Sequence, residues 1–152
     1  MCVCMCAHLE KDVAALAGAE LLTAAGLERG NLGGLIGGPP CQGFSFIGRR
    51  EEDDSRNQLF RAFFRLVAET RPAFYLAENV PGILSERYAG LVEHSMASLP
   101  KNYVRLAPLK VEAHKCAAPT TRKRVFFIGY DPDMVEAFDE DSFKPDETTE
   151  KV

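Results

Sequence analysis

The chain has 152 residues, of which 46% are hydrophobic and 26% charged, the length and composition of a single globular domain. The net charge of −4 is uneven, because residues 131–152 hold nine acidic side chains and two lysines, whereas residues 1–130 carry a net +3. No apolar run approaches the roughly 20 residues that span a bilayer, and no signal peptide is evident. These features exclude membrane and secreted classes, and we expect an intracellular location, cytoplasmic in a prokaryote or nuclear in a eukaryote.

Segments typical of strands and helices alternate along the chain. The expected strands cover residues 1–7, 35–36, 73–77, 103–111 and 125–129. The expected helices cover residues 14–25 and about 88–99, with a longer one between them that Asp54 or Ser55 caps and Pro72 stops. This alternation predicts an α/β domain with a mainly parallel sheet. In such sheets ligands bind beyond the carboxyl ends of the strands.

One cysteine stands in a distinctive loop that follows the short strand at residues 35–36. The loop reads Gly-Gly-Pro-Pro-Cys-Gln-Gly-Phe-Ser, from Gly37 to Ser45, and contains Cys41. The proline pair fixes the backbone before Cys41, and the glycine after Gln42 permits close approach of a substrate. A thiolate is a strong nucleophile, so this context favours covalent catalysis over the alternative of an inert buried cysteine.

Two further groups can serve such a nucleophile. Glu78 follows an apolar strand, where a carboxyl group partly removed from water can donate a proton, although it can equally be a helix cap or part of an ion pair. Arg122 and Arg124 flank Lys123 at the start of the last strand, and period two places both arginines on one side. Paired guanidinium groups bind carboxylates, phosphates or carbonyl oxygens, whereas the alternative is a solvated strand start.

The remaining cysteines and histidines give no comparable signal. Cys2, Cys4 and Cys6 alternate, which suits either a metal or redox cluster or a short buried strand. No second ligand pair follows them at the spacing of a zinc site, and the histidines are isolated, so we expect no metal.

Together, three motifs in this order resemble the cytosine-C5 DNA methyltransferases. They are the loop around Cys41, the Glu-Asn-Val at residues 78–80, and Arg122-x-Arg124 followed by Val-Phe-Phe-Ile-Gly. The resemblance covers about residues 12–129. It implies a Rossmann-like, S-adenosylmethionine-dependent methyltransferase fold and an enzyme that methylates C5 of a flipped-out cytosine in double-stranded DNA, as in restriction-modification systems.

The resemblance also implies roles for individual residues. Cys41 would be the nucleophile, Glu78 would contact the base, Arg124 would hold the cytosine O2, and Arg122 would position Glu78. The positions that line the cofactor pocket in the family are matched by Asp12, Pro39 and Leu59. Those that touch the DNA backbone are matched by Ser45 and Arg56.

Parts of the family pattern have no counterpart in this sequence. They are the glycine-rich cofactor loop that opens the family domain and the target-recognition region that follows the arginine motif. We therefore expect an incomplete catalytic domain over residues 1–130 and an acidic tail over 131–152, with a second chain as one possible source of the missing motifs. Two alternatives stay open at this stage: a transfer-RNA cytosine-5 methyltransferase, and a non-catalytic remnant or binding subunit.

Overall fold

A computed structural model of the chain describes residues 8–40 and 55–136, and the side chains of residues 55–57 fall outside that description. The helices are α1 (Gly18–Ala25), α2 (Ser55–Thr70) and α3 (Glu86–Met96), with short 3₁₀ helices η1 (Pro81–Leu84) and η2 (Ala113–Cys116). The strands are β1 (Gly34–Gly37), β2 (Phe74–Asn79), β3 (Val104–Arg105), β4 (Leu109–Glu112) and β5 (Lys123–Tyr130). The strand expected over residues 1–7 and most of the acidic tail lie outside the described residues.

The described strands form one open sheet in the order β1–β2–β5–β3, and β4 also pairs with β5. β1 is parallel to β2, whereas β5 is antiparallel to β2, β3 and β4. All the described strands except β5 therefore run in one direction. β5 is reversed because the short connection from β4 turns the chain back beside it, and a parallel pairing would need a longer crossover. The expected α/β class is confirmed.

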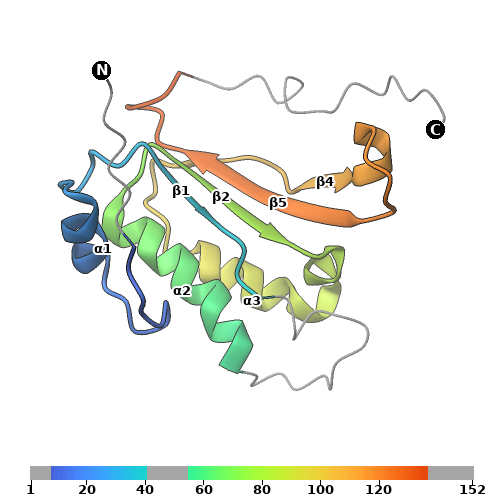
Figure 1. The fold of residues 1–152 in the computed structure, drawn as a ribbon, viewed down its shortest axis with the longest axis horizontal. Helices are drawn as coiled ribbons and strands as arrows, with labels where there is room; N and C mark the ends of the chain where they lie inside the picture. Colours follow the sequence, from blue (N-terminus) through green and yellow to red (C-terminus); the bar gives the residue numbers. More distant parts are fainter. Residues whose placement is uncertain (1–7, 41–54, 137–152) are drawn as a thin grey trace.

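The helix α2 packs its apolar face against the sheet, on the same side as α3 (Figure 1). The face is formed by Phe60, Phe63, Phe64, Leu66 and Val67, which are buried, while Leu59 is half-buried. The ring of Phe64 contacts those of Tyr75 and Phe127 edge to face, so the helix is joined to two central strands. The helix ends at Thr70, where Arg71 adopts φ 50° before Pro72, as the proline predicted. Within the described residues no helix is long and apolar enough to cross a membrane.

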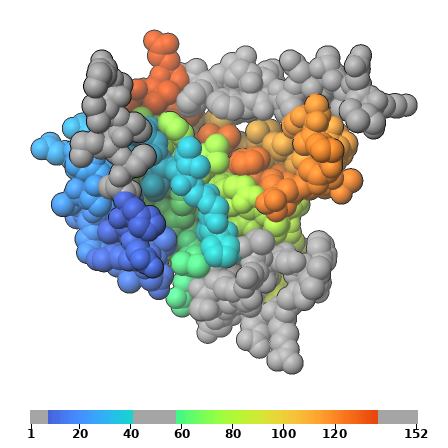
Figure 2. Space-filling model, in the orientation of Figure 1, coloured from blue at the N-terminus to red at the C-terminus, as the bar shows by residue number. Residues whose placement is uncertain are grey.

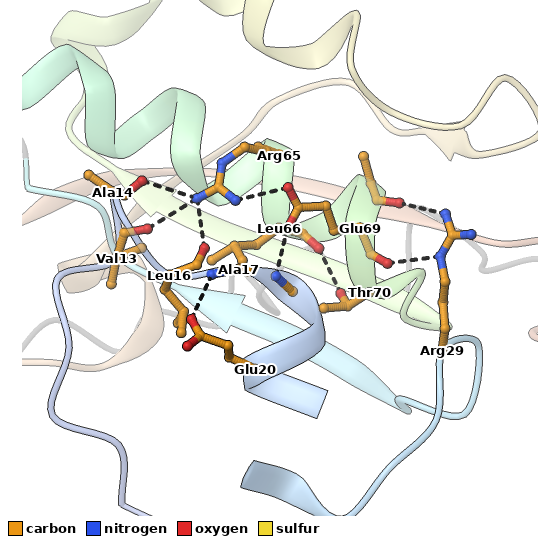
Figure 3. A network of polar contacts seen from close by, with 12 residues as sticks. Val13, Ala14, Leu16, Ala17, Glu20, Arg29, Arg65, Leu66, Glu69 and Thr70 are labelled. Atoms are coloured by element: carbon orange, nitrogen blue, oxygen red, sulfur yellow. Dashed lines mark hydrogen bonds and ion pairs between the residues drawn. The ribbon is translucent and has the colours of Figure 1, made fainter. Parts of the chain in front are cut away.

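The helix α1 begins four residues later than the sequence pattern predicted, and a distant side chain explains the difference. The backbone carbonyl of Asp12 accepts the N–H groups of Ala15 and Leu16, so the preceding residues form a separate turn. The N–H of Gly18 then donates to Glu69 Oε2 on α2 at 2.6 Å. Glu69 and Ala17, the residue before Gly18, are labelled in Figure 3. A Cβ at Gly18 would lie 2.6 Å from the Glu69 Cβ, so this close docking requires glycine.

The expected strand over 103–111 is divided into β3 and β4. Gly129 and Phe126 are three residues apart on β5, whereas their paired residues on the opposite segment, Arg105 and Leu109, are four residues apart. The segment therefore bulges between Arg105 and Leu109, a stretch that contains Pro108, which has no N–H to donate to the ladder. Period-two alternation alone does not reveal this interruption.

Replacing Glu69 with glutamine should lower the free energy of unfolding by about 1 kcal/mol at neutral pH. Hydrogen bonds to a charged group contribute roughly 1.5–3 kcal/mol, but the Glu69 side chain is 38% exposed, which reduces the effect. Burial acts to raise the pKa of Glu69, yet the Gly18 N–H and the Arg65 guanidinium outweigh it and the pKa is lowered. The stabilisation is therefore present at neutral pH and lost as pH falls through the lowered pKa.

Urea titrations of both proteins from neutral pH to below about pH 5 would test this. The difference in free energy of unfolding between the parent and the Glu69→Gln protein should shrink as the pH falls. Glu28→Gln changes the same group at an exposed site and should have no effect. A Glu69→Gln protein as stable as the parent at neutral pH would contradict the assignment.

Replacing Tyr75 with phenylalanine should instead stabilise the protein by up to about 1 kcal/mol. The Tyr75 hydroxyl is fully buried and has no hydrogen-bond partner within the described part of the chain, and burial raises its pKa above the usual value. The Tyr103 hydroxyl, by contrast, donates to the Pro72 carbonyl at 2.5 Å, so Tyr103→Phe should cost about 1 kcal/mol. Thermal or urea unfolding should show a gain of stability in Tyr75→Phe and a loss in Tyr103→Phe. Equal losses of stability in the two variants would contradict the account.

Candidate active site

The candidate site lies where β1 and β2 end side by side. Gly37 pairs with Ala77 at the last parallel rung, after which the chain leaves β1 through residues 38–40 toward Cys41. On the neighbouring strand the last two residues are Glu78 and Asn79. The segment that leads to the predicted nucleophile therefore emerges beside the predicted carboxylate.

Two glycines allow this segment to pass close to its neighbours. A Cβ at Gly37 would lie 2.8 Å from the Phe63 ring on α2. A Cβ at Gly38 would lie 3.2 Å from Glu78 Oε2, tighter than ordinary contact. A side chain at Gly37 would therefore overlap the Phe63 ring, whereas one at Gly38 would press on the flexible end of Glu78. A Cβ at Gly38 would require the Glu78 carboxylate to shift by a few tenths of an ångström.

The Glu78 carboxylate forms an ion pair with the Arg124 guanidinium. Glu78 lies opposite Phe126 in the antiparallel β2–β5 ladder, so Arg124 is its diagonal neighbour on the same face. The Arg124 guanidinium also donates to the Lys123 carbonyl at 2.8 Å, which fixes its position. Both side chains remain partly exposed, at 32% and 26%, so a polar ligand can still reach them.

Asn79 is a site residue for which the sequence motifs predicted no separate role. Its side chain is 1% exposed, and Oδ1 accepts the N–H of Val80 at 2.8 Å while Nδ2 donates to the Pro39 carbonyl at 3.4 Å. The amide thus connects the end of β2 to the segment that leads to Cys41. The available signal was an amide residue directly after Glu78, at the end of an apolar strand. Because buried amides require hydrogen-bond partners, such a position indicates a polar contact with a neighbouring segment.

The other two basic residues of the arginine motif point elsewhere. Lys123 Nζ lies 3.1 Å from Glu112 Oε2 on β4, and its hydrogen bond lowers the pKa of Glu112. Arg122 precedes β5 and is exposed, and its side chain contacts no carboxylate within the described residues. The structure therefore brings Arg124, and not Arg122, together with Glu78.

The three predicted cofactor residues come from three segments: Asp12 from the turn before α1, Pro39 from the loop after β1, and Leu59 from α2. Asp12 Oδ1 accepts the Ala14 N–H at 2.9 Å. A hollow of about 300 Å³ is lined by Ala14 and by residues of α2 and α3, and its described lining includes none of the three predicted residues. Leu59 is half-buried on α2, and Pro39 is half-buried after β1. A carboxylate that can accept a hydrogen bond and two apolar side chains are groups of the kind that bind the amino group and ring of an adenine. The residue types at these three positions are compatible with the adenine end of S-adenosylmethionine.

Three predicted residues fall outside the description. Cys41 and Ser45 lie in the undescribed segment, and only the backbone of Arg56 is described, in the first turn of α2. Within residues 8–40 and 55–136 there is no cluster of three side chains able to hold a metal ion.

Known proteins resemble this chain in sequence over most of its length. Residues 10–152 match the family model of the C-5 cytosine-specific DNA methylases. The Type II methyltransferase M.DdeI of Desulfomicrobium norvegicum is 42% identical over 103 residues, which are 66% of this chain and 25% of that protein. M.XorII of Xanthomonas oryzae pv. oryzae is 34% identical over 126 residues, which are 82% of this chain and 30% of that protein. The chain thus spans about a quarter to a third of the length of these relatives.

Solved structures agree with the sequence match. A crystal structure of a prophage-encoded DNA modification methyltransferase from E. coli superposes with a TM-score of 0.77 at 41% identity, covering 91% of this chain and 37% of that one. DNMT2 of Spodoptera frugiperda superposes with a TM-score of 0.59 at 18% identity, covering 86% and 37%, and this likeness bears on the fold alone. The fold is therefore that of the methyltransferases. With the family model matched over residues 10–152 and the strand ends arranged as described, the chain belongs to the C-5 cytosine-specific DNA methylase family.

Proposed function

We propose that this chain carries the base-binding and nucleophilic part of a DNA cytosine-C5 methyltransferase. The observation that carries the proposal is the placement of the Glu78–Arg124 pair against the segment that leads to Cys41. A carboxyl group and a guanidinium on one face can together hold the N3, exocyclic amine and O2 edge of cytosine.

The chemistry begins with addition of the Cys41 thiolate to C6 of cytosine. The new S–C6 bond moves the electron pair of the C5–C6 double bond toward C5 and the ring nitrogen N3. A proton held by Glu78 at N3 would neutralise the developing charge, which lowers the barrier. S-adenosylmethionine, when bound, supplies the electrophilic methyl group that C5 requires. A base then removes the C5 proton, and departure of the Cys41 thiolate restores the double bond.

Arg124 and Arg122 have related parts in this proposal. Arg124 pairs with Glu78 in the absence of the base, which keeps the carboxylate directed into the site. When cytosine enters, Arg124 would hold O2, and Arg122 would take over the positioning of Glu78. Because the target atoms lie inside a duplex, the base must leave the stack, at a cost of a few kcal/mol. Ser45 and Arg56 would contact the DNA backbone.

The cofactor and partners are also proposals. Asp12, Pro39 and Leu59 would hold the adenine end of S-adenosylmethionine. Since the chain spans only a quarter to a third of its relatives, recognition of a target sequence would come from further polypeptide, either continuous with this chain or supplied by a second chain. The enzyme would act inside the cell, where its DNA is.

Transfer of a labelled methyl group from S-adenosylmethionine to duplex DNA tests the proposal. The label should appear on cytosine C5 and disappear in the Cys41→Ser protein. A stem-loop RNA offered in parallel distinguishes the transfer-RNA-modifying alternative, because that activity would label the RNA and spare the duplex. Equal labelling by the parent and the Cys41→Ser protein would contradict the assignment of the nucleophile.

A further inference from the structure

Positive charge gathers in one part of this acidic chain. Residues 109–124, which we call the basic arm, comprise β4, η2, the following turn and the first two residues of β5. They contain five Lys or Arg residues and one acidic residue, a net charge of +4, whereas the whole chain carries −4. Figure 2 shows these orange residues together at one side of the molecule, away from the blue N-terminal segment. A local field of this sign attracts polyanions.

Only part of this charge is neutralised within the arm and its surroundings. Glu112 is engaged by Lys123, with His114 Nε2 at 3.7 Å from the same oxygen, and Glu78 is engaged by Arg124. The other three cations, Lys110, Lys115 and Arg122, are exposed and form no ion pair within the described residues, although the charge of Lys115 also helps to lower the pKa of Glu112. Their charge is therefore available to a partner.

The arm is a fixed ribbon. The β4–β5 ladder pairs Leu109 with Phe126 through to Glu112 with Lys123, and the Ala113 N–H extends it to the Arg122 carbonyl at 2.8 Å. Alternation along the strands places Lys110 on the face opposite Arg124. Cations thus stand on both faces of a two-stranded ribbon, and their backbone positions are set before any ligand binds.

The arm also lies beside the candidate active site. Lys110 pairs with Val125, and Val125 pairs with Asn79 on the next strand. Neighbouring strands are about 4.8 Å apart, so the Lys110 backbone is roughly 10 Å from Asn79. A duplex with a cytosine at Glu78 would carry its flanking phosphates past this ribbon, since DNA presents one charge per roughly 1.7 Å of its axis.

We propose that the basic arm binds the phosphate backbone of duplex DNA next to the cytosine held at Glu78, with Lys110 and Lys115 as sequence-independent contacts. This inference rests on the proposed function for its choice of duplex DNA. It assigns to the arm a positioning part in substrate binding and no part in the chemistry.

The salt dependence of binding tests the arm directly. A short fluorescein-labelled duplex of mixed sequence would be titrated with the full chain at several NaCl concentrations between about 50 and 200 mM. Lys110→Gln and Lys115→Gln should each weaken binding and reduce the slope of log K against log salt by about 0.9, and the double variant by about twice that. Glu112→Gln should act in the opposite direction, because it releases Lys123, and should tighten binding.

Lys101→Gln is the matched control. Lys101 is an exposed lysine at the other end of the sheet, next to Asn102, whose side chain bonds Asp131 just after β5. The Lys101→Gln substitution should leave both the affinity for DNA and the slope of log K against log salt unchanged. Equal effects of Lys101→Gln and Lys115→Gln would overturn the proposal, since they would show only a general charge effect, and so would unchanged slopes in the Lys110 and Lys115 variants.

A second readout separates this inference from the proposed function. Cysteine-dependent hydrogen exchange at cytosine C5, measured at saturating DNA, reports the chemistry independently of the arm. If C5 exchange occurs but the Lys110 and Lys115 variants keep the salt slope of the parent, the DNA-binding role of the basic arm is rejected and the proposed function is retained. Reduced slopes without exchange would reject the function and retain the arm as a DNA-binding surface. Arm-dependent binding that strongly prefers a stem-loop RNA would overturn the choice of duplex DNA.

Discussion

Replacing Phe64 with alanine should lower the free energy of unfolding by about 3–5 kcal/mol. Phe64 is fully buried, and its ring lies edge to face with those of Phe60 at 5.1 Å, Phe63 at 5.4 Å and Tyr75 at 5.6 Å between ring centres. Truncation removes the transfer free energy of the ring and leaves a cavity between α2 and the sheet that these rigid neighbours cannot fill. Domains of this size have only about 5–15 kcal/mol of stability, so a large part would be lost.

Urea unfolding followed by circular dichroism would measure this loss. Phe126→Ala is the matched control, because Phe126 is only partly buried and lies on the other face of the sheet. Its cost should be less than half that of Phe64→Ala. Equal costs would show that the core does not centre on the α2 side of the sheet.

Replacing Glu78 with glutamine should reduce the cytosine chemistry by about a hundredfold to ten-thousandfold while leaving the fold intact. Glutamine keeps the length of the side chain but holds neither the negative charge nor a transferable proton. The pair with Arg124 is partly exposed, so its loss should cost no more than about 1 kcal/mol of stability. This variant should therefore lose most of its activity while it keeps nearly all of its stability.

Glu112→Gln provides the control for Glu78→Gln. Both carboxylates lie on strands that flank β5, each pairs with a basic residue of β5, and their side chains are 31% and 32% exposed. At saturating DNA, Glu112→Gln should retain full activity. A comparable loss in both variants would mean that removal of any carboxylate beside β5 is damaging, and the specific role of Glu78 would be wrong.

The sequence predicted the elements whose signals are local. The stop at Pro72 identified the end of α2, and the expected end of the first helix at residue 25 agrees with α1, which ends at Ala25 before the left-handed Gly26. The order of three short motifs identified the family, and the family model matches residues 10–152. These features depend on residues close together in the chain, so a single sequence contains them.

The features that sequence reasoning missed depend on contacts between distant residues. The start of α1 is set by Glu69, which is 51 positions from Gly18. The role of Asn79 depends on the Pro39 carbonyl, 40 positions away. The pairing of Glu78 with Arg124 instead of Arg122 follows from the register of β2 against β5. None of these partners leaves a periodic or compositional signal.

Hydrogen exchange at C5 of cytosine is the most direct test of the central claim that Cys41 and Glu78 act together on the base. Duplex DNA would be incubated with the chain in heavy water and digested, and the deuterium content of its cytosine determined by mass spectrometry. Addition of the Cys41 thiolate to C6 makes C5 basic, so C5 should gain deuterium with the parent protein and none above background with Cys41→Ser. Uptake that is the same with the parent and Cys41→Ser, when both are folded and bound to DNA, would contradict the account.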